Sequence, residues 1–444
     1  MFRAAIVCLA LAACARSADP ASERETIVLV VVDTLRADAL DCDGSGPTPN
    51  LCALAAEGVR FHQAIASSGW TLPSVASILS GTWPEIHKAT GRKTILTPVS
   101  PDVPLAAELF AAAGWETAAV VNAAFLSPLL GLERGFGRFD HVHAFNRRVR
   151  RADATVDAAL AWMESSAAPR RFVLVHLFDP HLDYDPPPPF AAGRALTLEL
   201  CRAMGAQAVE TVRRQYMGEV AFVDREIGRL VDGLQARGEW ERTTFVVVSD
   251  HGEELWEHGG FEHGHTLYDE LIRVPLIVKL PARAGVAPRA VAEQVRTIDV
   301  LPTLLELAGI EPPATCAGAS LLALARGQSE APRVAFSQGR LYGSDLLSWR
   351  TGELHYLHDR GAGVEPRAQL FDHSGDPREQ EDLAVAHPET AARLERELAA
   401  FWSDLRRRGQ AFATPAPEDM GPTRIRAYVE SLESLGYTGR DEGE

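Results

Sequence analysis

Acidic and histidine side chains directly follow several runs of apolar, mostly β-branched residues in this chain. Asp33 follows IVLVVV, Asp179 and His181 follow FVLVHLF, and Asp250 and His251 follow TFVVVS. In open α/β sheets, ligands bind just beyond the carboxyl ends of the strands, so these side chains are expected at one edge of a sheet. Two carboxylates and an imidazole suit a divalent cation, and the imidazole favours Mn²⁺, Zn²⁺ or a similar ion over Ca²⁺. A lone aspartate after a strand is more often a helix cap, but several together predict a metal site.

A threonine stands where a helix is expected to begin. The segment GWTLPS places Thr71 two residues before Pro73–Ser80, which is expected to be a helix closed by Gly81. The helix dipole and its free amide groups favour an anion at this position. Coordination to a cation would lower the pKa of the Thr71 hydroxyl and make it a nucleophile. Threonine also caps helices routinely, and we expect Thr71 to fill both roles.

The spacing of apolar residues indicates the elements that position these groups. The continuous run Ile27–Val32 is typical of a strand that is buried on both faces. Strands that alternate with helices indicate a mostly parallel α/β sheet covered by helices on both sides. The other expected strands are 117–121, 172–178, 244–248 and 275–280, and the expected helices lie at 50–57 and around 103–113, 152–164, 211–236 and 299–308.

The pattern changes after about residue 310. Short strand-like pieces and a helix near 386–404 predict a smaller α+β subdomain over 311–410, after a catalytic domain over 26–310. The segment 411–444 is expected to be a polar tail whose amphipathic stretch, 425–435, docks on the body.

Composition excludes several classes of protein. The chain has 444 residues, of which 46% are hydrophobic and 23% charged, values that argue against a disordered, fibrous or polytopic membrane protein. Its formal net charge is −16, so it lacks the positive field that attracts polyanions, and no nucleic-acid partner is expected.

The amino terminus indicates export. Residues 1–14 form a short apolar run after Arg3, too short to span a membrane and typical of a secretory signal. Leu11-Ala12-Ala13-Cys14 resembles the bacterial lipobox, in which the cysteine is acylated. We therefore expect a membrane-anchored lipoprotein facing the periplasm or cell surface, with 15–25 as a tether. The alternative is an ordinary cleaved signal in which Cys14 is accidental.

Four other cysteines remain, at positions 42, 52, 201 and 316. An oxidising compartment allows disulfides, and four cysteines permit three pairings. Cys42 and Cys52 flank a short Gly/Pro loop and are the favoured pair, although buried free thiols are as compatible with the spacing. No zinc module matches.

The motifs together resemble the sulfatase family of the alkaline phosphatase superfamily over nearly the whole mature chain. The blocks are VDTLRAD at 32–38, TPNL at 48–51, TLPSVASILSG at 71–81, DPH at 179–181 with Tyr184 and Pro187, SDHGE at 249–253, HTLYDE at 265–270 with RVP at 273–275, LFD at 370–372 with Asp376, Pro377 and Glu379, and LGY at 435–437.

The resemblance implies a role for each matching residue. Asp33, Asp250 and His251 would hold one divalent metal ion (Ca, Mn, Zn or Mg), together with Thr71 at the nucleophile position. His181 would contact the anionic group of the substrate or its leaving oxygen.

Other candidate substrate-binding residues stand where the family carries lysines. Asn122 takes the place of the lysine that follows the Gly-Tyr-x-Thr motif, and either His263 or His265 takes that of the second active-site lysine.

The sequence also departs from the family pattern. Sulfatases carry C-x-P-x-R or S-x-P-x-R, whose first residue is oxidised to formylglycine, whereas here the two positions are Thr71 and Val75. Threonine cannot be so converted, and a threonine ester must be released by attack of water on the central atom. That route suits phosphorus better than sulfur.

Two functions follow. The first is a metal-dependent hydrolase or transferase of phosphate or sulfate esters in small molecules, glycans or lipids, with phosphate or phosphonate esters favoured on mechanism. The second is a non-catalytic lipoprotein that binds an anionic glycan or lipid. The retained Asp33, Asp250 and His251 favour the first, and Val75 and Asn122 motivate the second.

Overall fold

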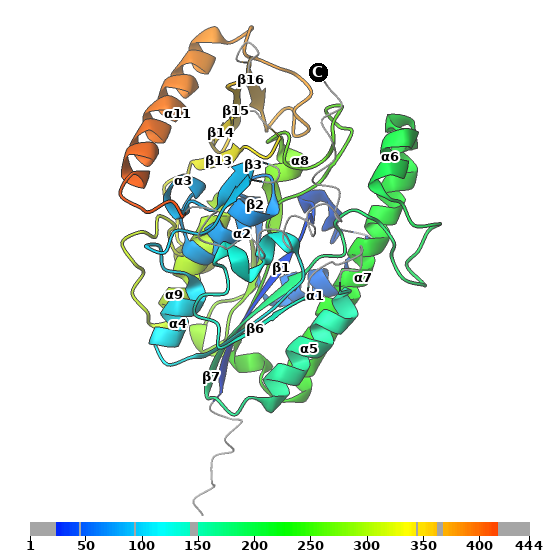
Figure 1. The fold of residues 1–444 in the computed structure, drawn as a ribbon, viewed down its shortest axis with the longest axis vertical. Helices are drawn as coiled ribbons and strands as arrows, with labels where there is room; N and C mark the ends of the chain where they lie inside the picture. The colour runs from blue at the N-terminus through cyan, green and yellow to red at the C-terminus, as the bar shows by residue number, and fades with distance from the viewer. Residues whose placement is uncertain are drawn as a thin grey trace, which may run out of the picture.

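The centre of the computed structural model is an eight-stranded, mostly parallel sheet (Figure 1), in the order β12-β2-β11-β8-β1-β7-β5-β6. The structure describes residues 24–43, 46–92, 95–142, 150–342, 345–361 and 367–415. The strands are β1 (Glu25–Val32), β2 (Val59–Ile65), β5 (Glu116–Val121), β6 (Arg138–His141), β7 (Arg170–Leu177), β8 (Thr243–Ser249), β11 (Arg273–Lys279) and β12 (Arg289–Arg296).

Strand β1 lies between β7 and β8 and is parallel to both. Its alternate side chains enter two different apolar cores. Ile27, Leu29 and Val31 pack on one face of the sheet, and Val28, Val30 and Val32 pack on the other. Because both faces are covered, the strand is apolar at every position from Ile27 to Val32, which confirms the predicted doubly covered sheet.

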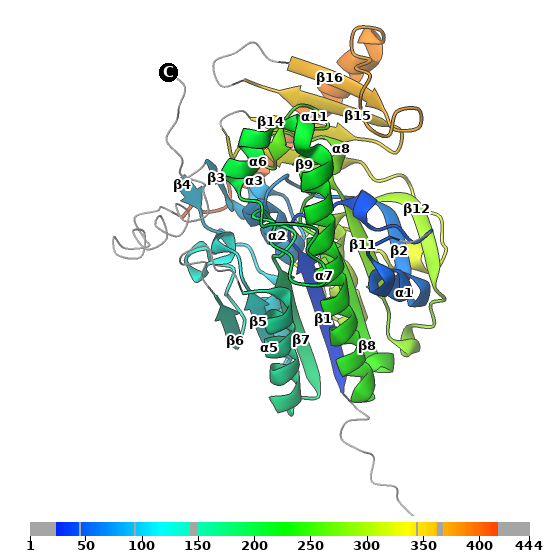
Figure 2. The ribbon, with the colours of Figure 1, turned by 90° about the vertical axis from the view of Figure 1, so that its right-hand side faces the viewer.

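Different helices cover the two faces. One face packs against α2 (Thr71–Ser80), α4 (Ala106–Ala112) and α9 (Val300–Ala308), and the other packs against α1 (Pro49–Glu57), α5 (Ala152–Ser165) and α7 (Val209–Ala236). Figure 2 shows α1, α5 and α7 in front of the central strands.

A smaller antiparallel sheet follows the central body and stands at the top of Figure 1. It consists of β13 (Ala335–Gly339), β14 (Leu346–Arg350), β15 (Leu354–Asp359) and β16 (Arg367–Asp372), with α11 (Pro388–Gly409) packed on one side. A buried cluster that includes Ile65, Leu271 and Phe371 joins this sheet to the body. The predicted α+β region after residue 310 is therefore present, and its boundaries at 311 and 410 stay predictions.

The start of α2 differs from the predicted start. The helix begins at Thr71 instead of Pro73, and Trp70 occupies the cap position with extended backbone. Thr71 therefore does not cap this helix, and that prediction was wrong. Pro73 has no amide hydrogen to donate, and the amide of Ser74 donates to the carbonyl of Trp70 at 3.4 Å. The Thr71 hydroxyl is left available for other contacts.

One disulfide joins Cys42 and Cys52, with a Cα–Cα distance of 5.3 Å, which confirms the favoured pairing. Cys201 and Cys316 are free. Cys14, the signal, most of the tether and the stretch 425–435 lie outside the described residues, so export, lipidation and docking of the tail stay predictions. No helix in the described part of the chain is long and apolar enough to span a membrane.

A buried histidine next to α2 gives a pH test of the fold. His87 ends α3 (Pro84–His87); its Nδ1 accepts the amide of Ala89 at 3.1 Å, and its Nε2 lies 3.0 Å from Ser77 Oγ on α2. Burial lowers the pKa of His87 to about 3, so the folded protein holds it neutral. Because the folded protein disfavours the charged imidazole, His87 does not lower the free energy of unfolding above its unfolded pKa of about 6.5. As pH falls from there toward 3, the unfolded chain takes up a proton that the folded protein does not, and the free energy of unfolding decreases.

We expect the free energy of unfolding of the wild type to fall faster with acid than that of His87→Gln. The difference should approach about 1.4 kcal/mol per pH unit below pH 6. Urea unfolding of both proteins at several values between pH 5 and 7 measures it. Parallel pH curves for the two proteins would show that the imidazole ionises equally well in the folded state.

Candidate active site

Three predicted ligands meet at the carboxyl ends of β1 and β8. Asp33 follows β1, and Asp250 and His251 follow β8, and the strand register pairs Val32 with Ser249, so the two aspartates are neighbours. All three side chains are fully buried, and one ligand atom from each lies within 4.8 Å of the others. The Nε2 atom of His251 is 3.7 Å from Asp33 Oδ1 and 3.6 Å from Asp250 Oδ2. The structure therefore brings together the residues that the strand ends indicated.

The chemistry of this cluster fits a divalent cation. Asp33 Oδ1 and Asp250 Oδ2 are buried and have no hydrogen-bond partner in the described protein. Burial, together with the charge of Asp33, raises the pKa of Asp250 to about 7. Burial opposes ionisation of Asp33 as well, but the neighbouring imidazoles of His176, His181 and His251 hold its pKa below the usual range. Two buried carboxylates that face each other in this way are stabilised by a bound cation.

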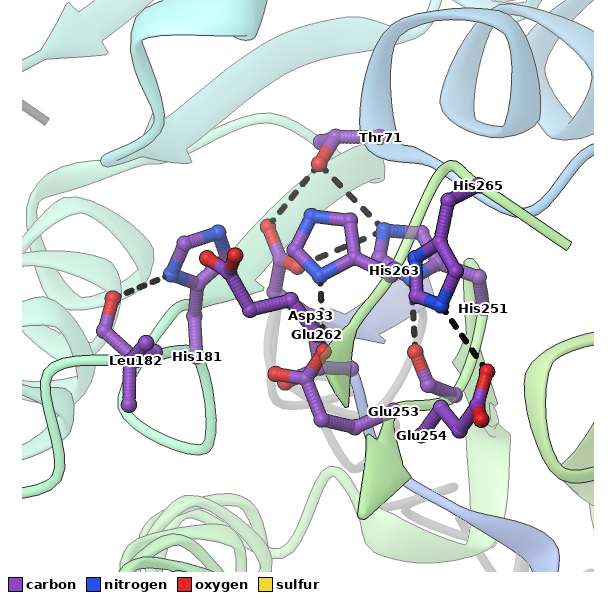
Figure 3. A network of polar contacts seen from close by, with 12 residues as sticks. Asp33, Thr71, His181, Leu182, His251, Glu253, Glu254, Glu262, His263 and His265 are labelled. Carbon is purple, nitrogen blue, oxygen red and sulfur yellow. Dashed lines mark hydrogen bonds and ion pairs between the residues drawn. The ribbon is translucent and has the colours of Figure 1, made fainter. Parts of the chain in front are cut away.

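Thr71 is the first residue of α2, and its hydroxyl points at this cluster (Figure 3). Its Oγ1 lies 3.5 Å from Asp33 Oδ2 and 3.4 Å from His251 Nε2. The whole of α2 is buried, so packing on every side holds the hydroxyl in place. The dipole of a helix favours negative charge at this end.

His181 lies on the loop that follows β7. Its ring stacks on Phe178 with 4.4 Å between ring centroids, and its Nδ1 is 2.5 Å from the carbonyl oxygen of Leu182. Figure 3 shows the ring on one side of the cluster around Asp33 and Thr71. Burial lowers the pKa of His181, against the attraction of Asp33.

The geometry separates His263 from His265. The ring of His263 lies 4.5 Å from that of His251 and 5.0 Å from that of His181, between centroids. His265 instead pairs with Glu254, with 2.9 Å between its Nε2 and the carboxylate (Figure 3). Of the two, His263 therefore lies within the group of imidazoles beside Thr71, and its contact with substrate stays a prediction.

Glu253 is part of the site but was not predicted from the sequence. One carboxylate oxygen lies 2.8 Å from His263 Nδ1, and the other accepts the hydroxyl of Tyr184 at 3.3 Å. Its backbone carbonyl accepts from Arg36 at 2.6 Å. Because Nδ1 faces Glu253, His263 Nε2 is left buried with no partner in the described protein. The SDHGE motif contains Glu253, but spacing alone did not reveal its histidine partner.

Asn122 has other contacts than the predicted one. Its amide nitrogen donates to Thr155 Oγ1 at 2.9 Å and to the carbonyl of His176 at 2.8 Å, and its oxygen accepts from Arg150 at 2.9 Å. These partners satisfy the hydrogen-bonding groups of the Asn122 side-chain amide, and none of them is one of the residues that contact Thr71. Substrate binding by Asn122 stays a prediction. In the structure, the contacts of Asn122 join the end of β5 to β7 and to the start of α5.

Comparisons with known proteins agree with the motifs. The model of the Sulfatase family matches residues 25–310. An N-acetylglucosamine-6-O-sulfatase of Bacteroides thetaiotaomicron is 31% identical over 186 residues, covering 38% of this chain and 31% of the relative. An arylsulfatase of Clostridium perfringens is 23% identical over 441 residues, covering 81% and 90%. The chain spans about a third of the length of the first curated relatives that it matches.

Solved structures share the fold. A structure in complex with D-glucosamine-2-N,6-O-disulfate has a TM-score of 0.71 at 20% identity, covering 87% of this chain and 98% of the other. The phosphonate monoester hydrolase of Agrobacterium radiobacter has a TM-score of 0.73 at 19% identity, covering 89% and 100%. With the family model matched over most of the central body, this chain belongs to the sulfatase family of the alkaline phosphatase superfamily.

Proposed function

We propose that this protein is a metal-dependent hydrolase or transferase that uses Thr71 as its nucleophile and acts on phosphate or phosphonate esters in preference to sulfate esters. The observation that carries the proposal is the position of Thr71 Oγ1, 3.5 Å from Asp33 Oδ2 and 3.4 Å from His251 Nε2 at the start of a buried helix. A hydroxyl held beside carboxylate and imidazole groups is suited to deprotonation and attack.

Asp33, Asp250 and His251 would hold the cation, with Thr71 as a further oxygen ligand. A bound divalent ion supplies Lewis acidity, which lowers the pKa of the hydroxyl and offsets charge on the transferred group. The orphaned oxygens Asp33 Oδ1 and Asp250 Oδ2 support this assignment. The mixed oxygen and nitrogen donors favour Mn²⁺, Zn²⁺ or a similar ion.

In the first step the Thr71 hydroxyl gives its proton to a neighbouring base, Asp33 or His251, and Oγ1 forms a bond to the central atom. The bond to the leaving oxygen breaks, and that oxygen takes up a proton. The amide groups at the start of α2 would face the transferred group. His181 and His263 flank the cluster and would contact the oxygens of the transferred group or the leaving oxygen. In the second step, water attacks the central atom, the bond to Thr71 breaks, and the acid product leaves with the hydroxyl restored.

The preference for phosphorus follows from the nucleophile. A formylglycine hydrate releases sulfate by cleavage of its own C–O bond, but a threonine ester has no second hydroxyl for that route. Release then requires attack at the central atom, which is accessible for phosphorus. Val75, which replaces the arginine of the family pattern, packs in the apolar core and gives no charge to an oxyanion. The fold shared with a phosphonate monoester hydrolase is consistent with this chemistry.

Metal analysis of the purified protein, followed by turnover of aryl phosphate, phosphodiester, phosphonate and sulfate substrates, tests the proposal. We expect about one bound divalent ion, the highest kcat/KM on a phosphorus ester, and loss of turnover in Thr71→Ala. A metal-free protein, or equal residual rates in both proteins, would leave only the binding-protein alternative. A faster sulfate ester would contradict the preference for phosphorus.

His263 and His265 form a matched pair for testing substrate contacts. We expect His263→Ala to lower kcat/KM by roughly 10- to 100-fold, because the site loses an imidazole whose Nε2 faces the cluster. His265→Ala, which removes the partner of Glu254 instead, is expected to change kcat/KM by less than about threefold. Steady-state kinetics of both variants measures this. Equal losses of kcat/KM in the two variants would show that both changes disturb the loop, and that the His263 ring makes no specific contact with substrate.

A further inference from the structure

His176 is an imidazole on a face of the sheet that is otherwise apolar along its strand. Alternate residues of β7 and its continuation, Phe172, Leu174 and Phe178, belong to the core that packs against α2. His176 lies between them at the position where another apolar side chain is expected. It is completely buried.

The ring of His176 is poorly satisfied by the protein around it. Its Nε2 is 3.5 Å from Asp33 Oδ2, and neither ring nitrogen makes a well-aligned hydrogen bond within the described residues. A buried polar group without a good partner destabilises the folded state relative to an apolar side chain of similar size. Packing alone therefore does not explain a histidine here, and such groups in native proteins call for another reason.

The backbone around His176 is hydrogen-bonded to β1 on one side and to Asn122 on the other. The register pairs His176 with Val31 of β1, and the amide of Asp33 donates to the carbonyl of Leu177 at 2.8 Å. The carbonyl of His176 accepts from Asn122, which in turn accepts from Arg150. A chain of contacts therefore runs from Arg150 through Asn122 and His176 to Asp33.

We propose that His176 is a positioning residue for the cation site, on the basis of the function proposed above. Its Nε2, 3.5 Å from Asp33 Oδ2, attracts that oxygen and restricts the rotation of the carboxylate, so that Oδ1 stays on the side of His251, 3.7 Å from His251 Nε2. His176 acts through Asp33, because the group of ligand atoms within 4.8 Å of one another consists of Asp33, Asp250 and His251. Groups that orient a metal ligand in this way strongly influence metal affinity.

The test compares His176→Phe and His176→Gln in the full chain. Mn²⁺ or Zn²⁺ is titrated into metal-free protein, and binding is followed by calorimetry. We expect His176→Phe to weaken metal binding by roughly 10- to 100-fold, and His176→Gln, which keeps an N–H donor, to recover most of that loss. Thermal unfolding of the metal-free proteins is expected to show that His176→Phe is at least as stable as the wild type.

The control variants distinguish a wrong positioning role for His176 from a wrong proposed function. Leu174→Met changes the same face of β7 two residues away and is expected to bind metal as the wild type does. If phenylalanine does not fit, His176→Leu replaces it in the same titration. Wild-type affinity in His176→Phe or His176→Leu would overturn the positioning role while leaving the proposed function intact. Failure of the wild-type protein itself to bind either ion would overturn the proposed function, and the positioning role with it.

Discussion

Replacing Thr71 with alanine is expected to lower kcat by about 10⁴-fold or more on the best phosphorus ester. The hydroxyl is the nucleophile of the proposed mechanism, and its Oγ1 lies within 3.5 Å of both Asp33 and His251. Alanine is a good helix former, and Thr71 makes no capping hydrogen bond, so α2 is expected to stay folded. Steady-state kinetics with an aryl phosphonate or phosphodiester measures the loss.

Thr71→Ser is the matched control, because it keeps a hydroxyl at the same helix position. We expect it to retain a substantial part of kcat, within roughly tenfold of the wild type. Thr71→Ala is also expected to keep its metal, since Asp33, Asp250 and His251 remain. Unchanged turnover in the alanine variant would show that another group attacks the substrate.

The second large effect is expected for Asp250→Asn, which should change metal binding and metal-free stability in opposite directions. The variant loses one of the two carboxylates that face the cation, so we expect its metal affinity to fall by at least 100-fold and activity to fall with it. The metal-free protein is expected to become more stable, because a buried carboxyl group beside Asp33 is replaced by a neutral amide.

The pH dependence follows from the pKa of Asp250, which burial and Asp33 raise to about 7. A carboxyl group whose pKa is raised in the folded state lowers the free energy of unfolding at pH values above its unfolded pKa. This destabilisation reaches its full size above the folded pKa of about 7. We therefore expect the gain in stability of metal-free Asp250→Asn to be largest near pH 8 and to disappear toward pH 4. Thermal unfolding with a chelator at both pH values measures it. A variant that is less stable than the wild type at pH 8 would show that the two carboxylates do not repel each other in the folded protein.

The central sheet could be predicted from the sequence because its strands are buried on both faces. Continuous apolar runs such as Ile27–Val32 and 245–248 have few alternatives to a buried strand. The edge strand β12 and its neighbour β2 were not predicted, because they mix exposed polar side chains such as His62 and Arg289 with apolar ones. Their pairing depends on tertiary contacts that no local pattern reveals.

The metal ligands could be predicted for a related reason. Asp33 and Asp250 follow strands that are neighbours in the sheet, and the parallel topology puts both strand ends at one edge. His263 and His265 could not be separated, because the conformation of their loop depends on the positions of Glu253 and Glu254.

The role of His176 could not be predicted from the sequence pattern of its strand. Its position alternates correctly with Phe172 and Leu174, so the sequence pattern shows one more core residue. Its importance becomes visible only when the neighbouring strand places Asp33 beside it. Likewise, the available hydroxyl of Thr71 depends on the cap position of Trp70, which an expected start at Pro73 did not reveal.

The central claim is that Thr71 itself receives the transferred group. The most direct measurement is mass spectrometry of peptides from enzyme that is acid-quenched during turnover of an aryl phosphonate or phosphodiester. The expected result is one phosphonyl group, or one phosphoryl group that keeps the second ester substituent of the phosphodiester, on Thr71, present before steady state ends and absent in Thr71→Ala. Turnover at the full rate with no modified Thr71 peptide at any quench time, or with the group on another residue, would contradict the claim.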